Sequence, residues 1–214
     1  MPRFLFFLFL FLLMAFSKAA YADWVELPLS DLQITSGQDR TRLLGSGLIE
    51  VKAPVFRATS RSSVSTASQL SFAYREALPN PEPTEGGQVR IQVGQKLMSK
   101  DPCNLIYVMW RLFPQERIVV SVKRHSGSTS AECGGQGYTN VASIAVPADL
   151  SARSGSYRDL QSVYDPSTRL LSVQINGREI WEGSLPTKLV RGLSGPVGVR
   201  ADNGHFRFRF YSGQ

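Results

Sequence analysis

The side chains best suited to chemistry in this sequence are basic and aromatic residues set between apolar ones. In the segment 205–211 three phenylalanines take every second position, and the positions between them hold His205, Arg207, Arg209 and Tyr211. Such alternation puts the two sets of side chains on opposite faces of a strand. Arginine forks pair with carboxylate or sulfate through two hydrogen bonds, and aromatic rings offer flat faces to sugars. This chemistry is that of binding an acidic glycan.

The same alternation can be followed through the other predicted strands. If their apolar positions face the core, the outward positions hold these candidate ligand-binding residues: Arg75, Arg90, Gln92, Tyr107, Arg111, Lys123, His205, Arg207, Arg209 and Tyr211. Two interpretations fit this set. It lines a groove for an acidic glycan, or it is an ordinary polar outer face, because arginine and lysine on such faces also prevent aggregation.

The residue patterns that catalysis or a metal would require are absent from the sequence. Glycoside hydrolysis needs two carboxylates on a rigid frame, but Glu82 and Glu85 lie in a proline-rich segment. No G-x-S-x-G elbow for a nucleophilic serine occurs. Two cysteines and two widely spaced histidines make no zinc pattern, and the pair 202–203 offers far fewer oxygens than calcium takes, so we expect a tight turn there. The sequence therefore predicts no catalytic residue, metal or cofactor.

One alternative is enzymatic. The triplet Tyr74-Arg75-Glu76 and the segment 88–92 (Gln-Val-Arg-Ile-Gln) resemble the arginine strand and the Gln-Ile-His strand of alginate-lyase-like sandwiches. The resemblance implies a polysaccharide lyase acting on a uronic-acid polymer. The histidine of the second strand is missing, because Val93 and Gly94 follow Gln92, so His205 and Tyr211 must then act in a different geometry.

The first 22 residues have the pattern of a cleavable signal peptide. Arg3 gives a positive start, residues 4–16 are apolar, and Ala20-Tyr21-Ala22 is a small-x-small cleavage site. A membrane anchor is the alternative, but Ser17 and Lys18 end the apolar run before the roughly 18 residues that a span needs. We therefore predict a secreted or periplasmic protein, cleaved near Ala22, with one β-sandwich domain over 23–214.

Composition limits the partners of the exported chain. Removing Arg3 and Lys18 leaves 22 basic and 17 acidic residues, a net charge of +5 in place of +7. This excess favours polyanionic neighbours, although it also serves solubility. We expect an acidic polysaccharide as the partner, no nucleic acid, and no membrane span after removal of the signal peptide.

Both cysteines, Cys103 and Cys133, fall in the exported part of the chain. In an oxidising compartment a pair with no third cysteine favours a disulfide. The glycine-rich segment 128–140 around Cys133 then forms either a binding loop or, as we expect, a tethered loop whose glycines serve turns.

The elements that position these side chains are short strands. Runs of β-branched and aromatic residues, each followed by Gly, Pro, Ser or Asn, predict strands at 24–27, 47–52, 69–75, 88–93, 105–112, 117–124, 141–146, 169–175, 178–181, 197–200 and 205–211. Many short strands at this spacing indicate an all-β sandwich or barrel. Segments 60–68 and 78–87 are expected to be loops, and 113–116 joins two central strands whose apolar face includes Val108, Trp110 and Val120.

The end of the chain resembles the concanavalin A-like lectin and glucanase sandwiches, whose two antiparallel sheets follow jelly-roll order. The resemblance rests on residues 170–181, with a turn at Asn176-Gly177, on Gly195-Pro-Val-Gly-Val-Arg200, and on Asp202-Asn-Gly204. It covers about the last quarter of the chain. It implies an all-β jelly roll whose ligands lie across the concave sheet, but members range from lectins to enzymes and structural domains.

Three functions follow from the sequence. The leading hypothesis is an exported carbohydrate-binding or cell-envelope module that holds an acidic glycan through Arg111, Lys123, Arg207 and Arg209, supported by Tyr107 or His205. The alternatives are the polysaccharide lyase and a structural envelope protein with a protein partner.

Overall fold

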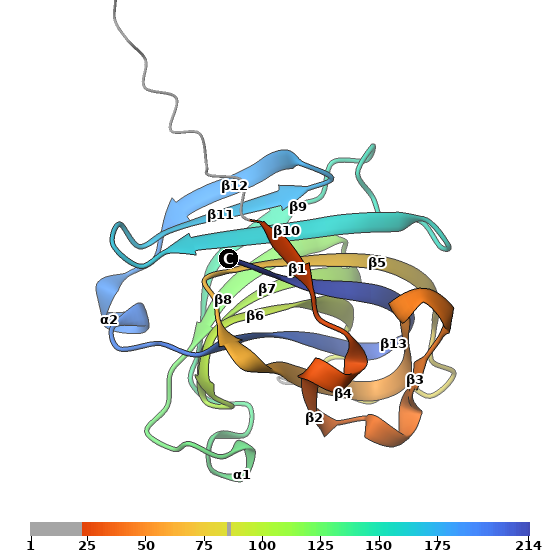
Figure 1. Cartoon of the computed structure of the whole chain (residues 1–214), viewed down its shortest axis with the longest axis horizontal. Helices are drawn as coiled ribbons and strands as arrows, with labels where there is room; N and C mark the ends of the chain where they lie inside the picture. Colours follow the sequence, from red (N-terminus) through yellow and green to blue (C-terminus); the bar gives the residue numbers. More distant parts are fainter. Residues whose placement is uncertain (1–22, 85–86) are drawn as a thin grey trace, which may run out of the picture.

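The computed structural model describes residues 23–84 and 87–214; the predicted signal peptide and Glu85 lie outside the described residues. Within them most residues lie in strands (Figure 1). The strands are β1 (Trp24–Glu26), β2 (Leu32–Ser36), β3 (Thr41–Leu43), β4 (Ile49–Val64), β5 (Ala67–Ala77), β6 (Ile91–Asp101), β7 (Asn104–Phe113), β8 (Arg117–Lys123), β9 (Tyr138–Ala145), β10 (Tyr157–Asp165), β11 (Leu170–Ile175), β12 (Arg178–Ser184) and β13 (Pro196–Gly213).

The strands form two antiparallel layers that share β4 and β13. One layer, here the groove sheet, runs β2, the second half of β4, the first half of β13, then β6, β7, β8 and β9. The other, the back sheet, runs β3, the first half of β4, the second half of β13, then β5, β10, β11 and β12. β1 pairs with the end of β13. The predicted all-β sandwich of the jelly-roll type is confirmed.

β13 passes from one layer to the other at a bend. Val199 and Ala201 face the core before it, and Phe206 and Phe208 face the core after it, so the inward set changes from odd to even positions. Asn203, at φ +58°, and a register shift against β5 at residues 205–206 absorb the change. The predicted tight turn at 202–203 is therefore wrong, because this segment is the bend within one long strand.

The core lies between the layers and is rich in aromatic rings. Phe72 of β5 meets Trp110 of β7 edge-on at 5.2 Å between ring centroids. Gln95 of β6 is fully buried there, and its amide donates to the Leu160 carbonyl at 2.8 Å and accepts from the Ser162 hydroxyl at 2.6 Å. These contacts join β6 to β10 across the core. The predicted central hairpin of β7 and β8 is confirmed, with its apolar face buried.

The predicted loop at 60–68 is wrong over most of its length, since β4 continues to Val64 and β5 starts at Ala67. The buried Ser65 hydroxyl, in the turn between β4 and β5, donates to the Gly213 carbonyl at 2.6 Å. This polar turn is therefore hydrogen-bonded to the C-terminal end of β13. The segment 78–84 runs outside the sheets apart from a single bridge at Pro83.

Helices contribute little to the described residues. The α-helices are α1 (Ser130–Cys133) and α2 (Thr187–Val190), and 3-10 turns cover Leu29–Asp31, Gln38–Arg40 and Gly45–Gly47. Among the described residues, no helix has the length and apolar character needed to cross a membrane.

Candidate functional site

Two adjoining hollows lie on the outer face of the groove sheet, on the side away from the core. The first, here the arginine hollow, has a volume of about 240 Å³ and is lined mainly by outward residues of β6, β7, β8, β9 and β13. Among them are Arg90, Gln92, Arg111, Ser121, Asn140 and Arg200. They share one face because strand residues two apart point the same way.

Three arginines cluster beside one end of the arginine hollow, and two of them, Arg90 and Arg111, line it. Arg111 on β7 stands directly opposite Arg117 on β8, and Arg90 precedes β6, whose Gln92 pairs with Arg111. No described carboxylate forms an ion pair with Arg90, Arg111 or Arg117, and their Nε atoms are buried without a hydrogen-bond partner in the described part of the chain. Burial is the main cause of a lowered pKa for Arg111, and repulsion from the charges of Arg90 and Arg117 lowers it further. Like charges opposite one another destabilise a sheet, so this end of the hollow is suited to an anion.

Next to these arginines lies one fully buried carboxylate, Asp202, which binds three neighbouring side chains. It accepts hydrogen bonds from Arg57 Nη1 at 2.8 Å, from Arg200 Nε at 2.8 Å, and from Gln92 Nε2 at 2.6 Å. Burial alone would raise the pKa of Asp202, but Arg200, Arg57 and Gln92 together lower it below its ordinary value. Asp202 is therefore a charged hub that fixes the orientation of its neighbours.

Two stacked tyrosines separate the hollows and line both of them. The rings of Tyr107 and Tyr138 lie 5.7 Å apart and 25° from parallel. The Arg200 guanidinium covers the Tyr107 ring at 5.3 Å, and the Lys123 ammonium covers the Tyr138 ring at 4.9 Å. Tyr107 is 4% exposed. Its ring therefore holds cations in place and has no open face for a sugar.

The second hollow, here the lysine hollow, has a volume of about 680 Å³ and lies toward β2 and β4. Its lining includes Arg57 of β4, Lys96 and Lys100 of β6, and Lys123 of β8. Lys96 lies across from Tyr107 in the pairing of β6 with β7 and is 6% exposed. Four of the five charged residues that line this hollow are thus basic.

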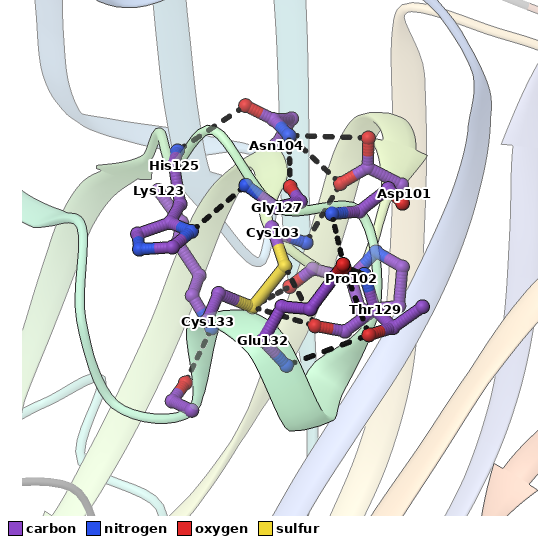
Figure 2. Close-up of a disulfide and its surroundings, with 12 residues drawn as sticks. Asp101, Pro102, Cys103, Asn104, Lys123, His125, Gly127, Thr129, Glu132 and Cys133 are labelled. Atoms are coloured by element: carbon purple, nitrogen blue, oxygen red, sulfur yellow. Dashed lines mark hydrogen bonds between the residues drawn. A yellow bond between two sulfur atoms is a disulfide. The ribbon is translucent and has the colours of Figure 1, made fainter.

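Residues of a loop tethered by a disulfide line both hollows. Figure 2 shows the disulfide and the hydrogen bonds around it. The predicted disulfide between Cys103 and Cys133 is confirmed, with 5.8 Å between the Cα atoms. It ties α1 to the start of β7, and Lys123 Nζ donates to the Gly134 carbonyl at 2.6 Å just beyond α1. Thr129 and Glu132 close a capping box on α1. Cys133 therefore belongs to a tethered loop whose next residues face the hollows.

The bend in β13 holds the other wall. Asn203 is fully buried; its side-chain amide donates to the Glu82 carbonyl at 2.7 Å and to the Arg90 carbonyl at 3.1 Å, and its Oδ1 accepts from the Glu82 amide at 2.8 Å. These bonds fix Arg90 beside the groove sheet.

The basic residues of the last strand lie elsewhere, on the outer face of the back sheet. Glu50 binds both His205, at 3.0 Å from Nε2, and Arg207, at 2.9 Å from Nε. The His205 hydrogen bond is the main cause of a lowered pKa for Glu50, and Arg207 adds to it against the effect of burial. Arg209 lies 3.8 Å from Glu26.

The predicted ligand-binding residues are thus divided between two faces. The groove sheet brings together Arg90, Gln92, Tyr107, Arg111 and Lys123. The back sheet carries Arg75, His205, Arg207, Arg209 and Tyr211. Arg75 is exposed and shares a shallow hollow with Glu76 and His205, and Tyr211 pairs with Glu26 of β1.

Sequence reasoning missed the groove residues Arg57, Lys96, Arg200 and Asp202. Alternation with Val197, Val199 and Ala201 could have placed Arg200 and Asp202 outward, on the same side as Gln92. Lys96 also faces outward on β6, between Gln95 and Leu97. The alternation does not reveal this, because the inward position 95 holds a polar glutamine instead of an apolar residue.

Neither histidine lines either hollow, since His125 lies by the disulfide loop and His205 on the back sheet. Within residues 23–84 and 87–214, no cluster of three or more His, Cys, Asp or Glu side chains has a geometry suited to a metal ion.

Comparison with known proteins identifies the fold. No protein-family model matches the chain, and no curated protein matches it in sequence. Among solved structures, the carbohydrate-binding module CBM66 from Bacillus subtilis matches with a TM-score of 0.57 at 10% identity, over 83% of this chain and 91% of the module. The acidic lectin of winged bean, in complex with methyl-α-D-galactose, matches with 0.56 at 13% identity, over 90% and 98%. The Emp46p carbohydrate recognition domain matches with 0.54 at 14% identity, over 88% and 97%.

These similarities establish the concanavalin A-like jelly-roll fold. They extend over most of the chain and are not confined to the last quarter, on which the sequence resemblance rests.

Proposed function

We propose that this chain is an exported carbohydrate-binding protein, and that its arginine hollow takes an acidic group of the glycan. The observation that carries this proposal is the cluster of Arg90, Arg111 and Arg117, which lacks a carboxylate partner among the described residues. A carboxylate or sulfate beside Arg90 and Arg111 relieves their repulsion and gives their guanidinium groups charged acceptors.

The surroundings support a polar ligand. Ser121 and Asn140 line the same hollow and offer hydrogen bonds to hydroxyl groups, while Asp202 holds Arg200 and Gln92 in fixed orientations. A rigid first layer of binding groups lowers the entropy cost of holding a ligand.

The fold and the disulfide support the wider role. Carbohydrate-binding proteins are among the structures that share this fold. The disulfide fits the oxidising conditions outside the cytoplasm, in agreement with a signal peptide at 1–22.

A glycan array tests the proposal, with the mature chain applied at low salt to carboxylated, sulfated and neutral oligosaccharides. We expect retention on acidic glycans and a loss of binding as salt rises, because salt screens charge pairs. Binding to neutral glycans alone, or to none, would overturn the proposal.

The matched variants are Arg111→Gln and Arg178→Gln. Both remove one positive charge, but Arg178 is exposed and paired with Asp149, and it lines neither hollow. Losing a hydrogen-bonded charge pair should weaken binding by roughly 10- to 100-fold in Arg111→Gln. Arg178→Gln should bind as the natural chain does, and equal losses in both variants would point to unspecific attraction.

A further inference from the structure

Among the described residues, a second basic group, Lys96 in the lysine hollow, has no bonding partner. Lys96 is 6% exposed, yet among the described residues its ammonium has no hydrogen bond and no ion pair. Buried charges in proteins are nearly always paired. An unpaired ammonium that lines a hollow of about 680 Å³ is a group that a ligand can satisfy.

The charges around Lys96 leave a local excess of positive charge. Arg57 of β4 and Arg200 of β13 lie near it, and Lys100 and Lys123 line the same hollow. Two carboxylates are close, and both already accept other donors. Asp202 is held by both arginines, and Asp101 accepts from Asn104 Nδ2 at 2.9 Å and from the Cys103 amide at 2.8 Å.

We propose that Lys96 and Arg57 form a second anion subsite, so that the groove takes two acidic groups of one glycan chain. This inference rests on the proposed function and narrows its ligand to a polyanion. The first acidic group lies in the arginine hollow and the second in the lysine hollow, and Tyr107 and Tyr138, which line both, mark the path between them.

The spacing of the two subsites fits an extended chain. Lys96 and Gln92 are four residues apart on β6, and so about 13 Å apart along the strand. Gly94 lies between them on the same face, and Met109 covers it. A single acidic sugar reaches one subsite only, so an oligomer gains a contact that a monomer does not.

The second subsite also links binding to protons. The pKa of Lys96 is lowered to about 7, mainly by burial and further by repulsion from Arg57 and Arg200. The negative charge of Asp202 acts in the opposite direction. An anion beside the ammonium favours its charged form and raises this pKa. Only the protonated lysine attracts the anion, so affinity for a polyanion falls as pH rises from 6 to 8.

The first test uses inorganic sulfate, which needs no knowledge of the glycan. The mature chain is labelled by reductive ¹³C-methylation of its lysines, and Lys96 is assigned with Lys96→Arg. We expect sulfate to move the titration midpoint of Lys96 upward, while the exposed Lys188 stays unchanged. A midpoint unaffected by sulfate, or an equal shift at both lysines, overturns the subsite and leaves the arginine hollow untouched.

The second test compares an acidic tetrasaccharide retained on the array with its monosaccharide, by calorimetry at pH 6 and pH 8. In the natural chain the tetrasaccharide should bind about tenfold more weakly at pH 8, and the monosaccharide should not change. Lys96→Gln should lose about tenfold at pH 6, Lys96→Arg should bind equally at both pH values, and Lys188→Gln should resemble the natural chain. If no acidic glycan binds, the proposed function fails; if glycans bind but Lys96→Gln matches the natural chain, only the second subsite fails.

Discussion

Asp202 is the residue whose replacement should disturb the groove most, because one carboxylate neutralises two buried or half-buried arginines. Asp202→Asn keeps the size of the side chain but removes its charge, so Arg57 and Arg200 lose the carboxylate that binds them both beside Lys96. Removing one partner of a buried ion pair costs about 3–5 kcal/mol. We expect a loss of that size in the free energy of unfolding at pH 7, measured by denaturant titration of tryptophan fluorescence.

The matched control is Asp149→Asn. Asp149 also pairs with an arginine at 2.8 Å, but its side chain is 66% exposed, and such surface pairs contribute below about 1 kcal/mol. Cations lower the pKa of Asp202, so its ionised form stabilises the fold above the ordinary value of 3.8, and this stability is lost as pH falls through the folded pKa. The difference between Asp202→Asn and the natural chain should therefore shrink in acid. A loss below 1 kcal/mol at pH 7, or a difference constant down to pH 2, would show that Asp202 does not stabilise the fold as a buried anion.

Three further predictions concern the frame of the groove. Asn203→Ala removes three side-chain hydrogen bonds from a fully buried site, so we expect a loss of about 2–4 kcal/mol in unfolding free energy and faster proteolysis in the segment 78–90; unchanged stability would contradict the role of the bend. Replacing Cys103 and Cys133 together by serine should cost about 3–4 kcal/mol in denaturant unfolding, and an equal midpoint would show that the loop needs no tether. Because the pKa of Lys96 is lowered to about 7, the unfolded chain binds more protons above that value, and stability should rise by roughly 2 kcal/mol between pH 7 and pH 9; Lys96→Met should flatten this rise, and the same slope in both proteins would show that Lys96 is not its source.

The fold class could be predicted from the sequence because apolar alternation is strong in most strands. The alternation of apolar residues breaks down in two strands. In β10 the inward positions are Leu160, Ser162 and Tyr164, and in β6 Gln95 faces the core. Serine and glutamine at core positions look like solvent-facing residues in a pattern. They are buried here because each satisfies the other across the layers, a long-range pairing that no local window contains.

The site could be predicted only in part for a related reason. Alternation shows that Arg111 and Arg207 both point away from the core, but it cannot say which of two sheets each belongs to. β13 serves both layers, so Arg200 faces the groove while Arg207, seven residues later, faces the opposite side of the molecule. The bend at Asn203 separates the two arginines. It is stabilised by the buried side-chain amide of Asn203, which donates to the backbone carbonyls of Glu82 and Arg90, far away in sequence.

The charge balance at each face also depends on tertiary contacts. On the back sheet, Arg207 pairs with Glu50 and Arg209 lies near Glu26, both far away in sequence. Among the described residues, Arg111 instead stands opposite Gln92 and Arg117 and forms no ion pair. A count of outward charges therefore does not distinguish a neutralised surface from a binding site.

Glycan binding in the arginine hollow is best tested by calorimetric titration of an acidic oligosaccharide into the mature chain and into Arg111→Gln at low salt. We expect binding by the natural chain, a loss of roughly 10- to 100-fold in Arg111→Gln, and no change in Arg207→Gln, whose arginine is paired with Glu50 on the back sheet. Equal affinity in the natural chain and Arg111→Gln, or a loss confined to Arg207→Gln, would contradict a glycan site in the arginine hollow.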